Sequence, residues 1–371
     1  MPNPSLKANT RYLILGMSLY PDYERGGAKY TQAVFEVAKK HCETRLLTLR
    51  YRLTISEPSM AQVRVPWVVP LNPMSIRFAL AYLLYIIRGM RLVIKWRPDV
   101  IHAANVYEAV IPIIMGRKFV TTIHDDYPFI VGKYGRLLAF ASLARASTIL
   151  TGSRWFAEYL QRLSILKRHK RIRVCILSNY VSDEEFSWLQ SKSSSRGEPS
   201  GSMTVLYVGA ILAVKGVGAL IRAFADIDNN LTLKMVGPPQ EPELIQNLPT
   251  NVRYLGVVNR AKLLELFAES YLVILPSIGR EGLGMVILEA MAAAKPLIVG
   301  NLAVYREVAG DAALYVNGDD PLSIRQAVIK LTKDVILYNK MRTASRVRIF
   351  DYTEGAFDRQ FSIALAEALR K

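Results

Sequence analysis

Two glutamates separated by seven residues flank a short glycine-containing turn in the second half of this chain. Glu281 precedes Gly282-Leu283-Gly284, and Glu289 lies within the apolar segment GLGMVILEAMAAA. This segment is apolar almost all the way round, which predicts a helix buried between layers. A lone buried carboxylate costs on the order of several kcal/mol unless it is paired or hydrogen-bonded. A polar group is therefore expected to meet Glu289.

The start of this helix has the features of an anion site. Two close glycines let a ligand approach the backbone, and the first helical amides, those of Met285 and Val286, have no partner within the helix. With carboxylates beside it, such a site suits a phosphate attached to polyhydroxylated rings, as in a nucleotide-sugar. The alternative is structural: Glu281 stabilises the helix dipole, and Glu289 binds neighbouring backbone groups. These residues alone leave both interpretations open.

The segment EGLGMVILEAMA resembles the E-x7-E signature of the retaining glycosyltransferases of family 4. The resemblance implies an α/β protein of the GT-B fold, in which two Rossmann-like domains face each other across a cleft. It also implies transfer of a hexose from a nucleotide-sugar with retention of the anomeric configuration, with Glu281 holding the sugar and Glu289 the ribose. The resemblance covers nearly the whole chain, most strongly residues 204–320 and least strongly residues 50–75. Ala294 departs from the family, which usually carries glycine there.

Length and composition fit two globular domains. A chain of 371 residues, 51% of them hydrophobic, is long enough for two substantial cores. The polar N-terminus MPNPSLKANT predicts no signal peptide. Cys42 and Cys175 have no metal-binding or redox spacing, so we expect buried thiols in a reducing compartment. The expected location is the cytoplasm.

The excess of positive charge is confined to the first half of the chain. Residues 1–182 hold 27 Lys and Arg against 10 Asp and Glu, whereas the remainder holds 21 of each, so the first part carries the whole formal net charge of +17. This asymmetry suggests that one half faces an anionic partner, which would be a membrane surface, an acidic acceptor or nucleic acid. A basic surface without a partner is the alternative.

Residues 76–96, IRFALAYLLYIIRGMRLVIKW, predict an amphipathic basic helix. The uninterrupted apolar run, residues 78–87, is too short to span a bilayer. At about 100° per residue, the four basic side chains fall within one narrow sector; they are Arg77, Arg88, Arg91 and Lys95. Such a helix either lies on an anionic membrane surface or is an ordinary domain helix with its charges in water.

A second basic segment, KRHKRIR at residues 167–173, holds five Lys and Arg in seven residues. No aromatic residues that could stack on bases are interleaved with these charges, and no known nucleic-acid-binding module surrounds them. We therefore expect no nucleic-acid partner, and interpret the segment as a membrane-facing or solvated patch.

A strand, a glycine-bearing loop and a helix open the N-terminal domain: Tyr12–Gly16, Gly26-Gly27 and Ala28–Lys40. Two later apolar runs end in His102 and His124, which predicts parallel strands that carry each histidine to the C-terminal edge of a sheet. The resemblance implies that Gly26-Gly27 approach the donor phosphates. It also implies that His124 reaches the donor sugar and supports the transition state, while His102 lies behind it.

Domain boundaries follow from composition and from the resemblance. Residues 182–202 are rich in Ser and Gly, which is typical of a linker. We expect an acceptor-binding Rossmann-like domain over 1–182, a linker over 183–202 and a nucleotide-sugar-binding Rossmann-like domain over 203–350. The last segment, 351–371, is expected to be a helix that packs back on the N-terminal domain.

The first strand of the second domain leads into GAILAVKG, residues 209–216. This loop resembles the family's loop whose Arg and Lys neutralise the donor pyrophosphate. Lys215 is retained, but Ala210 occupies the position of the Arg. Either Arg280 or another basic side chain replaces the missing cation, or donor affinity is weakened.

The resemblance therefore implies a set of site residues. The expected catalytic residues are His124 and Glu281. The expected donor-binding residues are Gly26, Gly27, Lys215, Gly282, Leu283, Gly284, Met285, Val286 and Glu289. Backbone amides and Lys215 meet the leaving-group charge, so neither a metal nor another cofactor is expected.

The expected acceptor is a lipid-linked or other membrane-associated glycan, with peripheral attachment to the inner face of the plasma membrane kept open. Besides nucleic-acid binding, which draws only on the positive charge, two alternatives remain. One is a donor-binding but non-catalytic partner subunit, which Ala210 favours. The other is a different GT-B enzyme, an epimerase or a phosphorylase.

Overall fold

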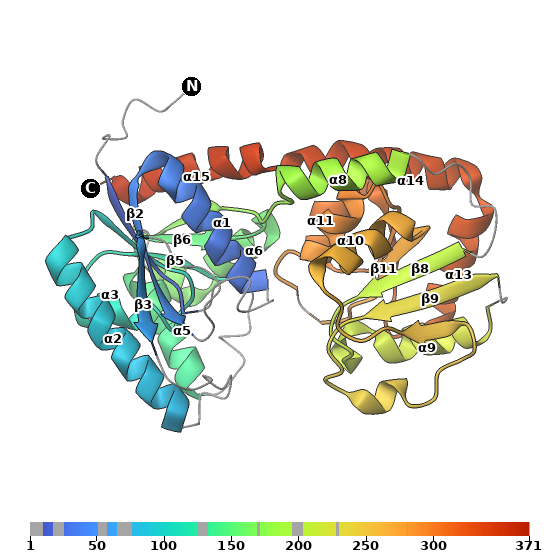
Figure 1. The fold of residues 1–371 in the computed structure, drawn as a ribbon, viewed down its shortest axis with the longest axis horizontal. Helices are drawn as coiled ribbons and strands as arrows, with labels where there is room; N and C mark the ends of the chain where they lie inside the picture. Colours follow the sequence, from blue (N-terminus) through green and yellow to red (C-terminus); the bar gives the residue numbers. More distant parts are fainter. Residues whose placement is uncertain are drawn as a thin grey trace. The chain divides into compact units, whose positions relative to one another are not determined.

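The computed structural model describes residues 10–17, 26–50, 58–64, 76–124, 133–168, 171–194, 203–227, 230–279 and 281–370. The chain divides into two compact units (Figure 1). The first unit contains Met1–Asn179 together with Phe357–Lys371, and the second contains Tyr180–Ala356. Each unit is an α/β domain built on its own parallel sheet.

In the described part of the first unit, seven parallel strands are ordered β3-β2-β1-β4-β5-β6-β7. The strands are β1 (Arg11–Leu15), β2 (Glu43–Arg50), β3 (Met60–Arg64), β4 (Val100–Ala103), β5 (Val120–Thr122), β6 (Thr148–Thr151) and β7 (Arg173–Ile176). The helices are α1 (Gly26–His41), α2 (Ile76–Trp96), α3 (Val110–Ile114), α5 (Lys133–Arg145), α6 (Arg154–Arg162), α7 (Ser164–Arg168) and α15 (Glu354–Leu369). The strand order reverses between β1 and β4, which is where doubly wound sheets bind ligands.

The first sheet is covered on both faces because its strands alternate two sets of buried side chains. Leu13 and Leu15 of β1 belong to a core that includes residues of α2, α3 and α5. Tyr12 points the other way and contacts Phe361 of α15 edge to face, with ring centroids 5.5 Å apart. Helices α1 and α15 therefore cover the face opposite α2 (Figure 1).

The C-terminal helix α15 is an integral part of the first unit. Phe357 contacts the ring of Tyr30 on α1, and Asp358 pairs with His41 at the end of α1. Further along, the side chain of Gln360 accepts a hydrogen bond from the Ser178 amide at 2.8 Å. The core of the first unit thus depends on both ends of the sequence.

In the described part of the second unit, six parallel strands are ordered β10-β9-β8-β11-β12-β13. The strands are β8 (Met203–Val208), β9 (Leu231–Val236), β10 (Val252–Tyr254), β11 (Leu272–Leu275), β12 (Leu297–Gly300) and β13 (Ala313–Val316). The α-helices are α8 (Asp183–Ser194), α9 (Val217–Ala225), α10 (Arg260–Glu269), α11 (Met285–Ala292), α12 (Ala303–Ala309), α13 (Pro321–Lys333) and α14 (Val335–Arg348). The described residues of this unit also form short 3-10 helices: η1 (Ala213–Lys215), η2 (Pro242–Ile245), η3 (Gly310–Ala312) and η4 (Ile349–Tyr352).

The linker prediction is wrong over 183–194, where the chain forms α8. Ser182 caps this helix by accepting a hydrogen bond from the Glu185 amide, and three acidic residues in the first turn favour the helix dipole. The side chain of Gln190 donates to the Ala292 carbonyl at 2.7 Å, which ties α8 to α11. The serines that suggested a linker therefore belong partly to a packed helix.

Two smaller sequence predictions also need revision. Gly26 and Gly27 form the first residues of α1 rather than the loop before it, because a helix start tolerates residues whose amides lack intrahelical partners. Cys42 and Cys175 are unpaired thiols, as expected, but they are only half-buried. Most of residues 50–75, where the resemblance is weakest, lies outside the described residues, which leave out 51–57 and 65–75.

Candidate functional site

Four loops of the second unit meet at the C-terminal edge of its sheet, and glycines make their close approach possible. Gly216 ends η1 with a left-handed φ of 73°, and a Cβ there would lie 2.1 Å from the carbonyl oxygen of Pro276. A Cβ on Gly318 would lie 2.0 Å from the same oxygen, and one on Gly300 would lie 2.0 Å from the Ser277 carbonyl oxygen. Only glycine fits at such distances. The turn after β11 is thereby fixed against the loops after β8, β12 and β13.

This packing brings Lys215 and Glu281 together. The Lys215 ammonium donates to Oε1 of Glu281, and the hydroxyl of Ser277 donates to the same oxygen at 3.1 Å. Behind them, the Tyr305 hydroxyl donates to Ser277 at 3.3 Å. Burial and the charge of Glu281 raise the pKa of Tyr305, which keeps this tyrosine a neutral donor. The result is a partly exposed Lys–Glu pair supported by a hydrogen-bonded chain.

The helix start predicted beside this pair is present. Gly284 is the N-cap residue of α11, with a left-handed φ of 86°, and it has no side chain to bind the first amides of the helix. Those amides, which include Met285 and Val286, lack carbonyl partners within the helix and form the positive end of its dipole. Gly284, Met285 and Val286 are partly exposed, whereas Leu283 is buried, so Leu283 packs through its side chain.

Glu289 is paired within the protein. Its carboxylate accepts a hydrogen bond at 2.5 Å from Arg260, the first residue of α10, and its side chain is 4% exposed. The same guanidinium donates two parallel hydrogen bonds to Glu185 of α8, at 2.6 and 2.5 Å. Burial by itself would lower the pKa of Arg260, and the two carboxylates raise it beyond its ordinary value. Arg260 is therefore the polar group that meets Glu289, with one edge of its guanidinium turned toward α8.

In the first unit, Gly27 and His124 lie close together. A Cβ on Gly27 would stand 3.8 Å from Nε2 of His124, which follows β5. The ring of Tyr30 packs edge-on against the imidazole, with centroids 4.8 Å apart. Burial lowers the pKa of His124 to about 4, although a hydrogen bond with the Ala104 backbone opposes the shift. The imidazole is thus neutral near pH 7, and it acts as a hydrogen-bonding group rather than a cation.

His102 lies within the core and serves the fold. Tyr12 and Thr122 bind its two ring nitrogens through their hydroxyls, at 3.0 and 2.7 Å. Burial and the neighbouring His124 lower the pKa of His102 to about 3. Both nitrogens are occupied, so His102 holds β1, β4 and β5 in register beneath His124.

Some of the predicted features cannot be placed. Arg280, the first candidate to replace the missing cation, and residues 18–25 of the first glycine loop lie outside the described residues. Ala210 contributes its carbonyl oxygen, which accepts a hydrogen bond from Tyr207 at 2.8 Å. Ala294 has a left-handed φ of 51°, which explains why glycine suits this position in the family. In the part of the chain that the structure describes, no cluster of three or more His, Cys, Asp or Glu could hold a metal.

Sequence reasoning missed several of these residues. Ser277 had a usable signal, since it directly follows the strand that precedes Glu281. Arg260 and Glu185 had none, because they lie 29 and 104 residues from Glu289 and no motif joins them. Glu108 also went unnoticed, as an isolated acid after a strand.

Comparison with known proteins decides the family. Residues 26–179 match the family model described as Glycosyltransferase Family 4, and residues 190–348 match the model described as Glycosyl transferases group 1. The chain belongs to the glycosyltransferases that these two models describe, family 4 and group 1. The two matches cover its two units in turn, and the motif at Glu281–Glu289 lies in the group 1 region.

Two named glycosyltransferases are similar in sequence. The chain is 29% identical over 227 residues to the O-antigen chain mannosyltransferase RfbU of Salmonella typhimurium, an alignment spanning 57% of this chain and 60% of that one. It is 27% identical over 176 residues to the phosphatidyl-myo-inositol mannosyltransferase of Mycobacterium leprae, spanning 44% of this chain and 47% of the relative. The aligned part thus covers about half the length of these curated relatives.

A solved glycosyltransferase structure shows the fold. Sucrose-phosphate synthase from Thermosynechococcus elongatus superposes with a TM-score of 0.79 at 16% identity, covering 96% of this chain and 98% of that one. Together with the two parallel-sheet units, this likeness shows that the family member described here has the GT-B fold.

A pH dependence of stability is expected from Glu108 of this glycosyltransferase. Its side chain is buried; one carboxylate oxygen accepts the Met17 amide at 3.0 Å, and the other has no hydrogen-bond partner among the described residues. Burial raises its pKa from 4.5 to about 7, although hydrogen bonds from backbone amides oppose the shift. The folded state therefore holds this proton more tightly, and its stabilising contribution is lost as pH rises from about 4.5 to 7. The loss amounts to about 3 kcal/mol.

The test compares the free energy of unfolding of the wild type and of Glu108→Gln, by urea denaturation at pH 5.0 and 7.5. The variant carries a neutral group at both values, so the wild type is expected to lose stability relative to it between them. His102 and His124 titrate in both proteins and cancel in the difference. A wild-type-minus-variant difference that is the same at both pH values would contradict the prediction.

Proposed function

We propose that this chain transfers a hexose from a nucleotide-sugar to a lipid-linked or other membrane-associated glycan, with retention of anomeric configuration. The observation that carries the proposal is the Lys215–Glu281 pair beside the start of α11. It combines a cation, a carboxylate and unpaired helix amides, which suit a diphosphate joined to a sugar. The family supplies the reaction class, glycosyl transfer.

Each unit has a proposed role. In the second unit, Lys215 and the amides of Gly284–Val286 stabilise charge on the departing diphosphate, the effect expected to dominate. Glu281 accepts hydrogen bonds from sugar hydroxyls, in exchange for those it now receives from Lys215 and Ser277. In the first unit, Gly26 and Gly27 leave room for donor phosphates, and neutral His124 contacts the sugar. We propose no metal or other cofactor, since Lys215 and the backbone supply the positive charge.

The nature of the acceptor is drawn from the relatives. One relative is named for O-antigen chains and another for phosphatidyl-myo-inositol, and both are mannosyltransferases. Mannose is therefore the first hexose to test, and a membrane-borne acceptor fits the basic first half of the chain. We propose a cytoplasmic location with peripheral attachment to the plasma membrane. None of the described helices is long and apolar enough to cross a membrane.

Donor binding is expected to raise the melting temperature. A ligand that binds only the folded protein at about a hundred times its Kd stabilises it by about 2.7 kcal/mol. That corresponds to several degrees for a domain of this size, at roughly 2–4 °C per kcal/mol. Thermal shift of the purified protein with UDP, GDP, ADP and their sugar conjugates measures this. Nucleotides of only one base are expected to raise the melting temperature. If none of them raises it, the proposed donor site is contradicted.

A second candidate function is donor binding without transfer. Ala210 favours it, because the family's second phosphate-binding cation is missing at that position. A thermal shift with a nucleotide-sugar, combined with no release of nucleotide when glycan acceptors are added, would support this role over catalysis.

A further inference from the structure

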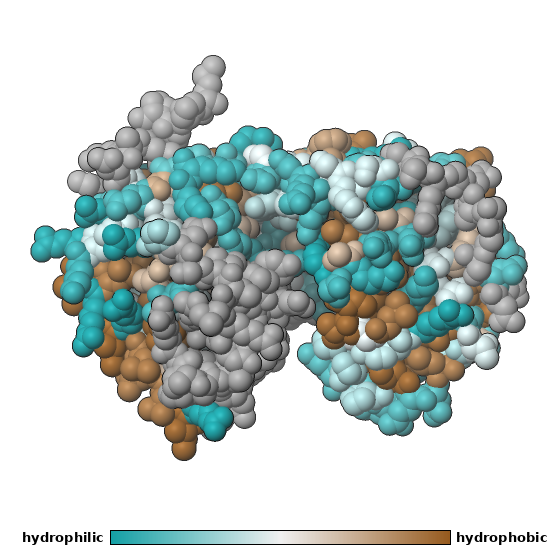
Figure 2. All heavy atoms as spheres, viewed as in Figure 1, coloured by the Kyte–Doolittle hydropathy of each residue, from teal (hydrophilic) through white to brown (hydrophobic). Residues whose placement is uncertain are grey.

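The outward side of α2 carries an apolar stripe. Six large hydrophobic side chains on this helix are exposed, from 39% at Ile87 to 79% at Ile76. They are Ile76, Leu80, Leu83, Leu84, Ile87 and Ile94. At about 100° per residue they fall on one side of the helix, opposite the buried residues Tyr85, Gly89 and Val93. Figure 2 shows hydrophobic residues gathered along this helix.

Positive charge flanks the stripe on one side. The side chains are those of Arg77, Arg88, Arg91 and Lys95, and all four residues are exposed. The helix contains no Asp or Glu, so no acid on α2 neutralises them. We call the six apolar and four basic side chains together the α2 face.

Neighbouring helices extend the apolar surface. Helix α3 packs against α2, and α5 packs against α3. Each contributes exposed hydrophobic residues: Ile114 of α3 is 60% exposed, and Leu137 of α5 is 66% exposed. An exposed apolar stripe such as that of α2 is unusual on a soluble domain and marks an interaction site.

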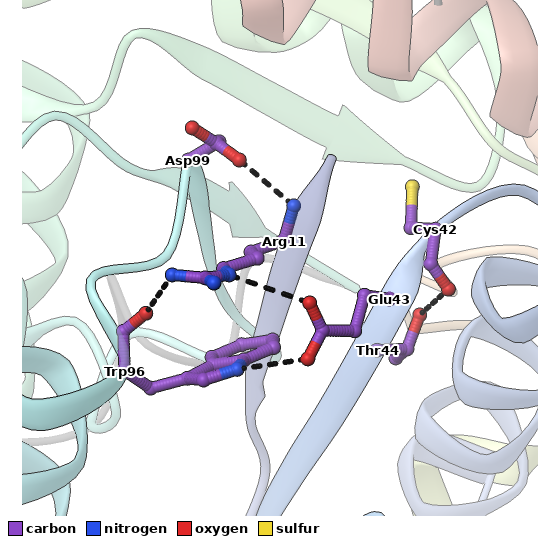
Figure 3. Close-up of polar contacts among 6 residues, drawn as sticks. All are labelled: Arg11, Cys42, Glu43, Thr44, Trp96 and Asp99. Atoms are coloured by element: carbon purple, nitrogen blue, oxygen red, sulfur yellow. Dashed lines mark hydrogen bonds and ion pairs between the residues drawn. The ribbon is translucent and has the colours of Figure 1, made fainter. Parts of the chain in front are cut away.

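The α2 face is held outward by the packing of the helix. At its C-terminal end, the indole of Trp96 donates to Glu43 at 3.2 Å, and Arg11 binds both Glu43 and the Trp96 carbonyl (Figure 3). The guanidinium of Arg45 lies 4.8 Å from the centroid of the Trp96 ring. In the middle of the helix, the Tyr85 hydroxyl donates to the Leu47 carbonyl. These contacts fix the rotation of α2, so the apolar stripe cannot turn into the core.

We propose that the α2 face binds the surface of an anionic lipid bilayer. An apolar stripe beside Lys and Arg is the pattern of helices that lie in the membrane interface, where apolar groups enter the acyl boundary and basic groups meet anionic headgroups. A second copy of the chain is a poorer occupant. The helix has no acid that could pair with the Arg and Lys of a facing copy. The charge of residues 1–182, +17, also complements an anionic surface.

Membrane binding by the α2 face rests on the proposed function, because a membrane-borne acceptor needs an enzyme held at the membrane. Vesicle binding is nevertheless measured without any sugar transfer, so the two can fail separately. The full-length protein is sedimented with vesicles of phosphatidylcholine, with and without phosphatidylglycerol. Binding is expected only with the anionic lipid, and raising the salt concentration should weaken it. Replacing Arg88, Arg91 and Lys95 together by Gln should weaken it about a hundredfold, since each basic residue contributes about a factor of five.

The apolar part is tested by Leu80→Ser, Leu83→Ser and Ile87→Ser in one variant, which should weaken vesicle binding by at least about tenfold. Matched controls lie on α14, where Ile336 and Val347 are exposed apolar residues and Lys340 and Arg346 are exposed basic ones. Replacing these pairs by Ser and by Gln should leave binding unchanged. All variants are checked for an unchanged melting temperature and for the nucleotide-induced shift, which reports the donor site separately.

Two results would overturn the proposal. One is equal binding of the wild type and of both α2 variants to anionic vesicles. The other is a wild-type protein that self-associates in sedimentation velocity and becomes monomeric in the apolar α2 variant, which would assign the face to a second copy.

Discussion

Replacing Glu281 by glutamine is expected to lower the rate of sugar transfer by about 10²–10³, the range measured when one preorganised group is lost from an active site. The carboxylate of Glu281 receives hydrogen bonds from Lys215 and Ser277. Glutamine keeps the shape of the side chain but lacks the charge that pairs with Lys215. The contact with the sugar is therefore weakened, and the Lys215 ammonium is no longer held in its orientation. The measurement is nucleotide release with the donor that the thermal shift identifies.

The control for this variant is Glu265→Gln, which removes an exposed carboxylate paired with Lys262 on the surface of α10. It should leave turnover unchanged, and both variants should melt close to the wild type. Lys215→Met tests the partner of Glu281. If the two residues act as a unit, turnover of the double variant Glu281→Gln/Lys215→Met should be no lower than that of the slower single variant. Unchanged turnover of Glu281→Gln would remove this residue from the proposed mechanism.

Replacing Arg260 by alanine is expected to lower the free energy of unfolding by about 3–5 kcal/mol, the cost of leaving one partner of a buried ion pair alone. The variant removes the ion pair of Arg260 with Glu289, whose side chain is 4% exposed, and the ion pair of Arg260 with Glu185 of α8. Urea denaturation measures the loss. Because Glu185 and Glu289 come from α8 and α11, the variant should also loosen the contact between these helices.

A paired substitution separates the missing ion pair from the missing side chain. Arg260→Met combined with Glu289→Leu should recover much of the stability, because replacing both charges by apolar groups leaves no buried charge. A loss below about 1 kcal/mol for Arg260→Ala would mean that water reaches Glu289 readily, which the observed burial argues against.

The fold was predictable from sequence to the extent that local patterns carry it. The buried helix after Gly284 was expected over nearly the observed residues, because its apolar residues lie almost all the way round the helix. Helix α2 was also expected with its observed bounds, since its basic sector has a helical period. In contrast, α8 was missed because serine content outweighed the acidic first turn that favours a helix.

The candidate site was predictable only in part, because its side chains pair over long separations in sequence. Two separate motifs identified Glu281 and Lys215, but the pairing of these residues depends on the glycines that bring the two loops together. Glu289 was predicted to need a polar partner, and this was correct, but the identity of Arg260 follows only from the packing of α10 on α8, which places Arg260 within reach of α11. The ribose contact predicted for Glu289 stays a prediction, as do the sugar contacts of Glu281 and His124.

The return of α15 to the first unit has a consequence for how this chain is made. Residues Phe357 and Phe361 complete the packing around Tyr30 and Tyr12, so the first unit lacks part of its core until α15 has left the ribosome. The whole of the second unit, Tyr180–Ala356, emerges before that point and can fold as a unit. The first unit therefore begins to be made before the second and is completed after it.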